Sequence, residues 1–112
     1  MQMIVAYIRP RMQDAVVEVL RRMNVPGASF SSVDGFGLEP DREGKASYDE
    51  IVSPYAHKIK LEVVCTDEQG ADLVDAIARA AQTGRRGDGK VYVLPVVQAV
   101  DIRTYDGSAK AR

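Results

Sequence analysis

The sequence has no tryptophan, one cysteine and one histidine among its 112 residues. One cysteine cannot form an internal disulfide and cannot supply a thiolate metal site within one chain. There is no apolar run of about 18 residues and no signal-peptide pattern, so we expect no membrane-spanning helix and a cytoplasmic protein. We predict no metal site built by the protein alone.

The sequence also lacks an excess of charge of either sign. Its 15 basic and 16 acidic residues leave a net charge of −1, so any anion site must be local. Single-stranded RNA binders stack bases on clustered aromatic side chains, whereas the two Phe and five Tyr are spread along this chain. RNA binding is an alternative that a filter-binding assay would test, but we predict no nucleic-acid partner.

The apolar pattern predicts one domain over residues 1–112, of a size that buries roughly 65% of its unfolded surface. The expected elements alternate in the order strand, helix, strand, strand, helix, strand: residues 2–8, 12–23, 28–36, 58–65, 66–83 and 91–97. The first strand is almost continuously apolar, which is typical of a central strand covered on both faces. A short last strand through Val100, Ile102 and Thr104 would precede a polar tail over residues 105–112.

Local signals support this order. In the third strand Ile59, Leu61, Val63 and Cys65 alternate with polar neighbours, so Cys65 is expected to be a small buried hydrophobe. Thr66 and Gln69 have the spacing of a helix capping box. The buried stripe of that helix should consist of Leu73, Val74, Ile77, Ala78 and Ala81. Pro95 marks the fourth strand as an edge strand or a bulge.

This element order is the split βαβ arrangement of the ferredoxin-like α+β fold, an antiparallel sheet with two helices. Acylphosphatases, metal chaperones and RNA-recognition domains share that layout. Function must therefore be argued from a site.

The stretch from Thr83 to Lys90 is the strongest candidate site, because it places three glycines beside three cations and one carboxylate. Glycines allow positive φ and close backbone approach, and successive N–H groups form a concave nest for anions. Phosphate is the expected guest. The plain alternative is a helix C-cap at Gly84 followed by a tight turn.

Together with Gly35-Phe36-Gly37 and the strand opened by Lys58, the Thr-x-x-x-Gly-Asp-Gly-Lys segment resembles the PII signal-transduction family over nearly the whole chain. The resemblance implies a homotrimer that binds ADP, AMP or ATP, with Mg²⁺ accompanying ATP, in clefts between subunits. It also implies a long loop over residues 38–55 that contacts a partner protein. Members are sensors rather than enzymes, so we predict no catalytic activity.

The resemblance also assigns candidate nucleotide contacts. Phosphates would lie on the loop over residues 83–90, and the base would lie near the third strand. The implied nucleotide-binding residues are Ser29, Gly35, Phe36, Gly37, Glu62, Val64, Thr83, Arg86, Gly87, Asp88, Gly89, Lys90 and Arg103. The structural alternatives are a solvated Glu62, a turn residue at Ser29 and a core anchor at Phe36.

Two departures from the family pattern bear on the phosphates. Leu38 and Asp101 stand where the family has basic residues. Because a charge-assisted hydrogen bond contributes about 1.5–3 kcal/mol, the loss of two would weaken terminal-phosphate binding by more than about a hundredfold. Arg86 is an added cation that would compensate. We therefore hypothesise that ADP or AMP competes well with ATP.

The effector site implied by the resemblance is changed as well. Lys58 is kept, but Glu39 stands where the family has a glutamine that helps to hold Mg²⁺ and 2-oxoglutarate. A second carboxylate disfavours a dicarboxylate ligand. A smaller anion such as bicarbonate, held by Lys58 with help from His57, is one replacement.

The long loop departs furthest from the family. Ile51 occupies the position of the tyrosine that the family uridylylates, so we do not expect that modification. Arg42, Lys45, Tyr48 and Ile51 are the candidate contacts to a partner, which we expect to be a membrane transporter or its regulator. The alternative is a solvated, variable loop.

A small phosphate-hydrolysing enzyme on the same fold is the competing class. It would need a base or a water-orienting group near the glycine loop. Asp88 and Asp101 are the only candidates, and the sequence offers neither one a histidine or metal partner.

Overall fold

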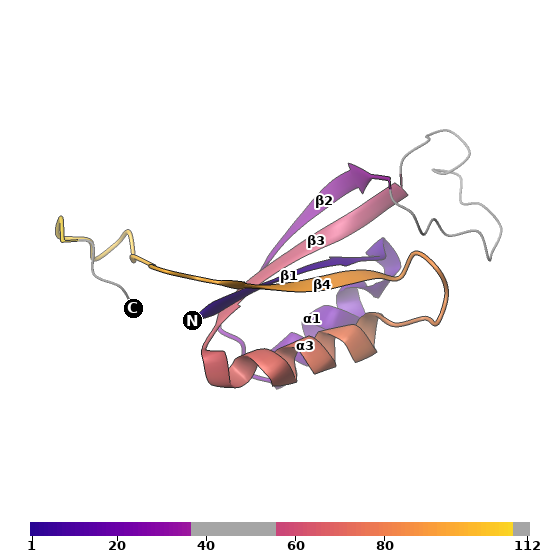
Figure 1. The fold of residues 1–112 in the computed structure, drawn as a ribbon, viewed down its shortest axis with the longest axis horizontal. Helices are drawn as coiled ribbons and strands as arrows, with labels where there is room; N and C mark the ends of the chain where they lie inside the picture. The colour runs from indigo at the N-terminus through magenta and orange to yellow at the C-terminus, as the bar shows by residue number, and fades with distance from the viewer. Residues whose placement is uncertain (37–55, 109–112) are drawn as a thin grey trace.

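The sheet of this protein has the strand order β2-β3-β1-β4, and every neighbouring pair is antiparallel. The computed structural model describes residues 1–36 and 56–108. Figure 1 shows the two helices together on one face of the sheet. The elements are β1 (Gln2–Ile8), the short 3₁₀ helix η1 (Pro10–Met12), α1 (Gln13–Arg22), β2 (Ser29–Gly35), β3 (Ala56–Cys65), α3 (Asp67–Ala81) and β4 (Gly89–Pro95). The ferredoxin-like prediction is confirmed.

The first turn after the sheet follows from Pro10, which lacks an N–H and cannot continue β1. The N–H of Met12 donates to the carbonyl of Arg9 at 3.0 Å, and α1 begins at once. Val16 and Leu20 are the buried residues of α1, one turn apart on its inner face. The helix ends before Asn24, whose φ of 58° lies in the left-handed region.

The start of α3 is fixed by the predicted capping box. The N–H of Gln69 donates to Thr66 Oγ1 at 3.3 Å, and the N–H of Thr66 donates to Gln69 Oε1 at 3.2 Å. Leu73, Ile77 and Ala81 are buried, and Val74 packs at the margin of the core. Ala78 was expected in this stripe but is exposed, because it lies one residue beyond Ile77 and faces outward.

The core lies between the helices and one face of the sheet. Strand pairing aligns Ile4 with Val63 and Val93, and Ala6 with Leu61 and Val91, so these side chains share one face. Side chains from β1, β3 and both helices form the cluster: Ile4, Ala6, Ile8, Val16, Leu20, Ile59, Leu61, Val63, Cys65, Leu73, Ile77 and Ala81. Cys65 is buried as predicted, and burial raises the pKa of its thiol.

The opposite face of the sheet carries no helix. It presents apolar side chains from three strands, namely Met3, Val5, Tyr7, Val64, Tyr92 and Leu94. Val64 and Leu94 are exposed, and the rings of Tyr7 and Tyr92 meet edge to face at 6.2 Å. Within the single chain, helices cover β1 on one face only, so the expectation of cover on both faces is not met.

The chain leaves the sheet after β4, an edge strand as Pro95 predicted. The N–H of Val96 donates to the carbonyl of Met1 at 3.0 Å. Residues 102–104 then form a turn, in which the N–H of Tyr105 donates to the carbonyl of Ile102 at 3.3 Å. The predicted last strand through Val100, Ile102 and Thr104 is therefore wrong, because residues 96–108 run away from the end of the sheet and do not lie along its free edges on β2 and β4 (Figure 1).

Several predicted site residues lie outside the described residues. They are Gly37, Leu38, Glu39, Arg42, Lys45, Tyr48 and Ile51, with the rest of residues 37–55. The last part of the expected polar tail, residues 109–112, lies outside them too. In the parts of the chain that the structure describes, no helix is long and apolar enough to cross a membrane.

Candidate functional site at the glycine loop

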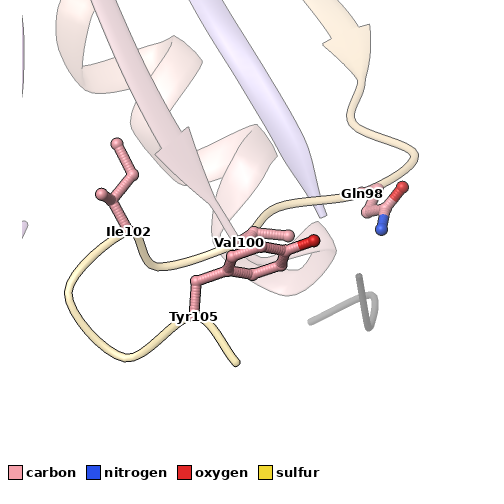
Figure 2. Close-up of a pocket in the computed structure, with 4 residues that line it drawn as sticks. All are labelled: Gln98, Val100, Ile102 and Tyr105. Atoms are coloured by element: carbon pink, nitrogen blue, oxygen red, sulfur yellow. The ribbon is translucent and has the colours of Figure 1, made fainter. Parts of the chain in front are cut away.

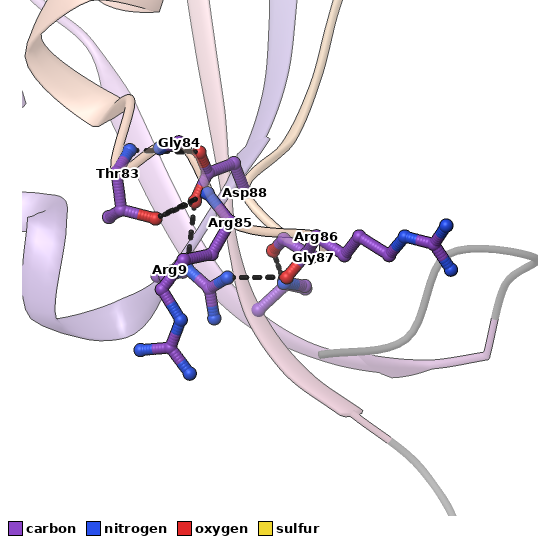
Figure 3. A network of polar contacts seen from close by, with 8 residues as sticks. Arg9, Thr83, Gly84, Arg85, Arg86, Gly87 and Asp88 are labelled. Carbon is purple, nitrogen blue, oxygen red and sulfur yellow. Dashed lines mark hydrogen bonds and ion pairs between the residues drawn. The ribbon is translucent and has the colours of Figure 1, made fainter. Parts of the chain in front are cut away.

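The carboxylate of Asp88 organises the loop between α3 and β4. It accepts hydrogen bonds from the N–H of Thr83 at 2.8 Å, the N–H of Gly84 at 2.9 Å and Arg9 Nε at 3.0 Å. The hydroxyl of Thr83 donates to it as well. Figure 3 shows this network, with the donors converging on one side chain. The alternative of a helix C-cap at Gly84 is wrong, because α3 ends at Ala81 with an extended Gln82 as its C-cap, and Gly84 belongs to the loop that Asp88 holds.

The pKa of Asp88 reflects these contacts. Partial burial alone would raise it, but hydrogen bonds from Thr83, Arg9 and Gly84 outweigh burial and hold it well below the usual range of an aspartate. A carboxylate that holds its charge this firmly is a poor proton acceptor. Asp88 therefore holds the loop together by accepting hydrogen bonds, which speaks against its role as a base in the hydrolase alternative.

Arg9 belongs to this network, although the sequence analysis did not assign it to the site. Its side chain is buried, its Nε contacts Asp88, and its Nη2 donates to the carbonyl of Arg86 at 2.6 Å. Arg9 directly follows β1 and precedes Pro10, so its position in the sequence indicates only the end of the strand. The available signal was a cation directly after a strand that was expected to be buried. Such a cation needs a partner, and the loop offers one carboxylate, Asp88, between two glycines.

Lys58 reaches the same loop from β3. Its Nζ donates to the carbonyl of Gly87, the residue next to the one held by Arg9. Two cations from different strands therefore bind two consecutive carbonyls. Lys58 was predicted as an effector ligand, and in the structure it contacts the glycine loop, whereas Glu39, the other predicted effector ligand, lies outside the described residues.

The glycines of the loop are required by geometry. Gly84 and Gly87 have φ of 85° and 91°, which few other residues adopt. Gly89 has φ of 111°, and a Cβ there would lie 1.7 Å from the carbonyl oxygen of Tyr7. Because β1 and β4 meet at this point, with Ile8 opposite Gly89, a side chain at position 89 would separate the strands.

A cleft of about 560 Å³ opens beside the loop. Its walls come from the end of β1, the end of α3 and the beginning of β4, and they include Arg79, Gln82, Asp88, Gly89 and Lys90. Three of the predicted nucleotide-binding residues therefore line one concave surface. The side chain of Arg86 points away from the hydrogen-bonded network, as Figure 3 shows.

Two more predicted residues lie at this end of the sheet. Gly35 pairs with Ala56, and Phe36 follows it. Phe36 is 88% exposed, so the core-anchor alternative is wrong. Near them His57 Nδ1 forms a contact with Asp34 across the two strands. The glycine loop and the described residues that flank segment 37–55 therefore share one end of the molecule (Figure 1).

The residues predicted for the base side lie farther along the sheet. Ser29 pairs with Glu62 across β2 and β3, and Val64 lies two residues beyond. All three project from the helix-free face, since Glu62 and Val64 alternate with the buried Leu61 and Val63. Ser29 is the first residue of β2 rather than a turn residue.

Arg103 and Asp101 lie at the other end of the chain's long axis. Residues 96–108 extend away from the sheet at the end opposite the glycine loop (Figure 1), so one chain does not unite Arg103 with Asp88. The same segment forms a shallow apolar hollow of about 440 Å³ lined by Gln98, Val100, Ile102 and Tyr105. In Figure 2 the side chains of Val100 and Tyr105 lie together while Ile102 points outward.

In residues 1–36 and 56–108, no group of three or more His, Cys, Asp or Glu side chains could hold a metal ion.

Comparison with known proteins identifies the family. The family model described as "Nitrogen regulatory protein P-II" matches residues 1–106. The chain is 35% identical over 103 residues to nitrogen regulatory protein GlnK2 of Haloferax mediterranei, which covers 92% of this chain and 84% of the relative. It is 35% identical over 111 residues to the P-II protein of Bradyrhizobium diazoefficiens, covering 99% of each.

A third relative agrees. The P-II protein of Rhizobium meliloti is 38% identical over 104 residues, or 93% of each chain. These matches extend through the glycine loop. The protein therefore belongs to the nitrogen regulatory P-II family of signalling proteins.

Proposed function

We propose that this protein is a non-catalytic sensor that binds adenine nucleotides on residues 83–90 and regulates a partner through loop 38–55. One observation carries the proposal. The glycine loop, its cation Lys58 and the strand ends flanking segment 37–55 lie at the same end of the sheet. A phosphate bound to the loop would therefore lie next to both strand ends that flank segment 37–55, and it could change the conformation of that segment.

The loop has the chemistry that phosphate requires. The carbonyls of Arg86 and Gly87 are bound inward by cations, and Lys90 lines the adjoining cleft. Outward N–H groups together with a cation are sufficient to hold a di- or triphosphate. Mg²⁺ would accompany ATP and would be held mainly by the phosphates.

A homotrimer would complete the site. The helix-free face carries exposed Val64, Tyr92 and Leu94, and segment 96–108 exposes Val97 and Ile102. Apolar surface of this kind is typical of contacts between copies of a chain. Arg103 would then reach the glycine loop of a neighbouring subunit, and the nucleotide would lie in the cleft between them.

The phosphate contacts favour shorter nucleotides. Asp101 brings negative charge close to Arg103 on the segment that would approach the phosphates, and Leu38 offers no charge. Arg86 points outward from the loop and would partly compensate. ADP and AMP should therefore compete with ATP, and an ATP affinity at least about tenfold above that for ADP would refute this preference.

The effector would be a small anion held by Lys58. Glu39 disfavours 2-oxoglutarate, and bicarbonate carries less charge. The partner would be a membrane transporter or its regulator, contacted in the cytoplasm by Arg42, Lys45, Tyr48 and Ile51.

Isothermal titration with ATP, ADP and AMP, each with and without Mg²⁺, 2-oxoglutarate and bicarbonate, tests the proposal. Preference for ADP or AMP, coupled to bicarbonate or to no effector, would support a divergent energy or inorganic-carbon sensor. Tight ATP binding enhanced by 2-oxoglutarate would indicate a conventional nitrogen sensor. Absence of nucleotide binding would overturn the proposal.

A further inference from the structure

The guanidinium of Arg9 is joined to the glycine loop at two points. Nε donates to Asp88 Oδ1 at 3.0 Å, and Nη2 donates to the carbonyl of Arg86 at 2.6 Å. The side chain comes from the end of β1, and only 8% of the residue is exposed. A buried charge that contacts both a carboxylate and a carbonyl ties the position of one to the other.

The contact with Arg86 sets the direction of a neighbouring donor. In a trans peptide the carbonyl and the N–H point in opposite directions. Because the carbonyl of Arg86 points inward to Arg9, the N–H of Gly87 must point outward. The carbonyl of Gly87 is bound by Lys58 in the same way, so the N–H of Asp88 also points outward.

These two outward N–H groups are the donors that the proposed phosphate site needs. Among residues 1–36 and 56–108, neither of them donates a hydrogen bond to another described residue. Arg9 itself is below the surface of the loop and would not meet the ligand. Its effect on a ligand must therefore pass through the peptide between Arg86 and Gly87.

We propose that Arg9 is a positioning residue for phosphate recognition, which aims the N–H groups of the glycine loop by holding Asp88 and the Arg86 carbonyl together. The inference rests on the proposed function, because it assumes that phosphate is the guest. It adds a residue that lies outside the glycine loop in sequence. Arginine suits this role because its planar fork can serve two acceptors in fixed geometry, whereas lysine offers a point charge.

The test compares Arg9→Gln, Arg9→Lys and the matched control Arg22→Gln. Arg22 is an exposed arginine in the last turn of α1 with no contact to the loop. Without ligand, the ¹⁵N–¹H signals of residues 83–88 should shift in Arg9→Gln, while signals of the sheet stay in place. Titration with ADP should show a loss of roughly tenfold or more in Arg9→Gln, and no change in Arg22→Gln.

The conservative variant Arg9→Lys separates the effect of side-chain geometry from the effect of charge. Arg9→Lys keeps the charge but lacks the rigid planar fork that serves Asp88 and the Arg86 carbonyl in fixed geometry, so it should restore the signals of Asp88 and not the full ADP affinity. Full restoration by lysine would overturn the positioning role and leave only an effect of charge.

A double-mutant cycle with Asp88→Asn supplies a readout that general damage would not reproduce. If the two residues act as one unit, the double variant should bind ADP about as weakly as the weaker single variant. Additive losses would overturn the proposal.

The two proposals fail in different ways. If the wild type binds no nucleotide, the proposed function fails. The role of Arg9 in orienting the loop is then tested by the ¹⁵N–¹H signals of the loop alone. Unmoved signals of Gly87 and Asp88 in Arg9→Gln would then overturn its role in aiming the loop, and shifted signals would support it.

Discussion

The glycine loop and segment 96–108 lie at opposite ends of the sheet, and the sequence resemblance assigns phosphate contacts to both. In the loop, the carboxylate of Asp88 accepts hydrogen bonds from Thr83, Gly84 and Arg9 of the same chain. In the segment, Val97 and Ile102 are 89% and 93% exposed. The glycine loop is held by contacts within its own chain, whereas the exposed apolar side chains of segment 96–108 are typical of a surface that a second copy covers.

The largest expected effect breaks the loop itself. Gly89→Ala would place a Cβ against the carbonyl of Tyr7 at a φ of 111°, so we expect a loss of about 3 kcal/mol or more in the free energy of unfolding. Urea denaturation followed by circular dichroism measures this. Gly27→Ala is the matched control, because a Cβ there meets nothing within 4 Å. Equal stability of the two variants would contradict the close approach of β1 and β4.

A second substitution removes the charge at the centre of the loop. Asp88→Asn leaves Arg9 buried without its carboxylate, so we expect a loss of about 2 kcal/mol in the free energy of unfolding at pH 7. Chemical denaturation measures it, with Asp75→Asn on the exposed face of α3 as the control.

The same variant should change the pH dependence. The folded-state pKa of Asp88 is lowered, so its stabilisation is fully present above the unfolded value of about 3.9 and is lost as pH falls through the folded pKa. Below about pH 4 the wild type should therefore lose stability more steeply than Asp88→Asn. Parallel curves of stability against pH for the two proteins would contradict the inference that the charged Asp88 holds the loop together.

A third substitution tests whether the two regions meet between subunits. Arg103→Gln should weaken ADP binding roughly tenfold, because a charge-assisted hydrogen bond to phosphate would be lost. Isothermal titration measures the affinity, and Arg22→Gln is again the control. Unchanged affinity would show that the two regions act separately.

The smallest effect concerns the exposed segment. In a single chain, Ile102→Ser should change the free energy of unfolding by less than about 0.5 kcal/mol, because 93% of Ile102 is already exposed. Sedimentation velocity of the same variant should show weaker self-association. Unaltered association would mean that Ile102 is not part of the contact between copies.

Much of the fold could be predicted, because its signals are local. The alternation in β3 and the capping box of Thr66 and Gln69 depend on neighbouring residues, and both predictions are confirmed. The strand expected near Ile102 is wrong because a strand needs a partner alongside it, and residues 96–108 extend away from the free sheet edges on β2 and β4 (Figure 1).

The candidate site was predictable to a lesser extent. The glycine spacing identified the loop, but the role of Arg9 depends on a contact across 79 positions of sequence that no local pattern contains. Under the proposed function, the place of Arg103 in the site would depend on another copy of the chain, which neither spacing nor a single chain describes.

Three lysines lie close together on the helix-free face near the loop. Lys60 and Lys90 both pair with Tyr7, and Lys58 lies two residues from Lys60 on the same strand. Like charges at this spacing repel within a Debye length of about 10 Å at 0.1 M ionic strength. The free protein should therefore be least stable in dilute buffer, and a multivalent anion should protect it against heating most strongly there.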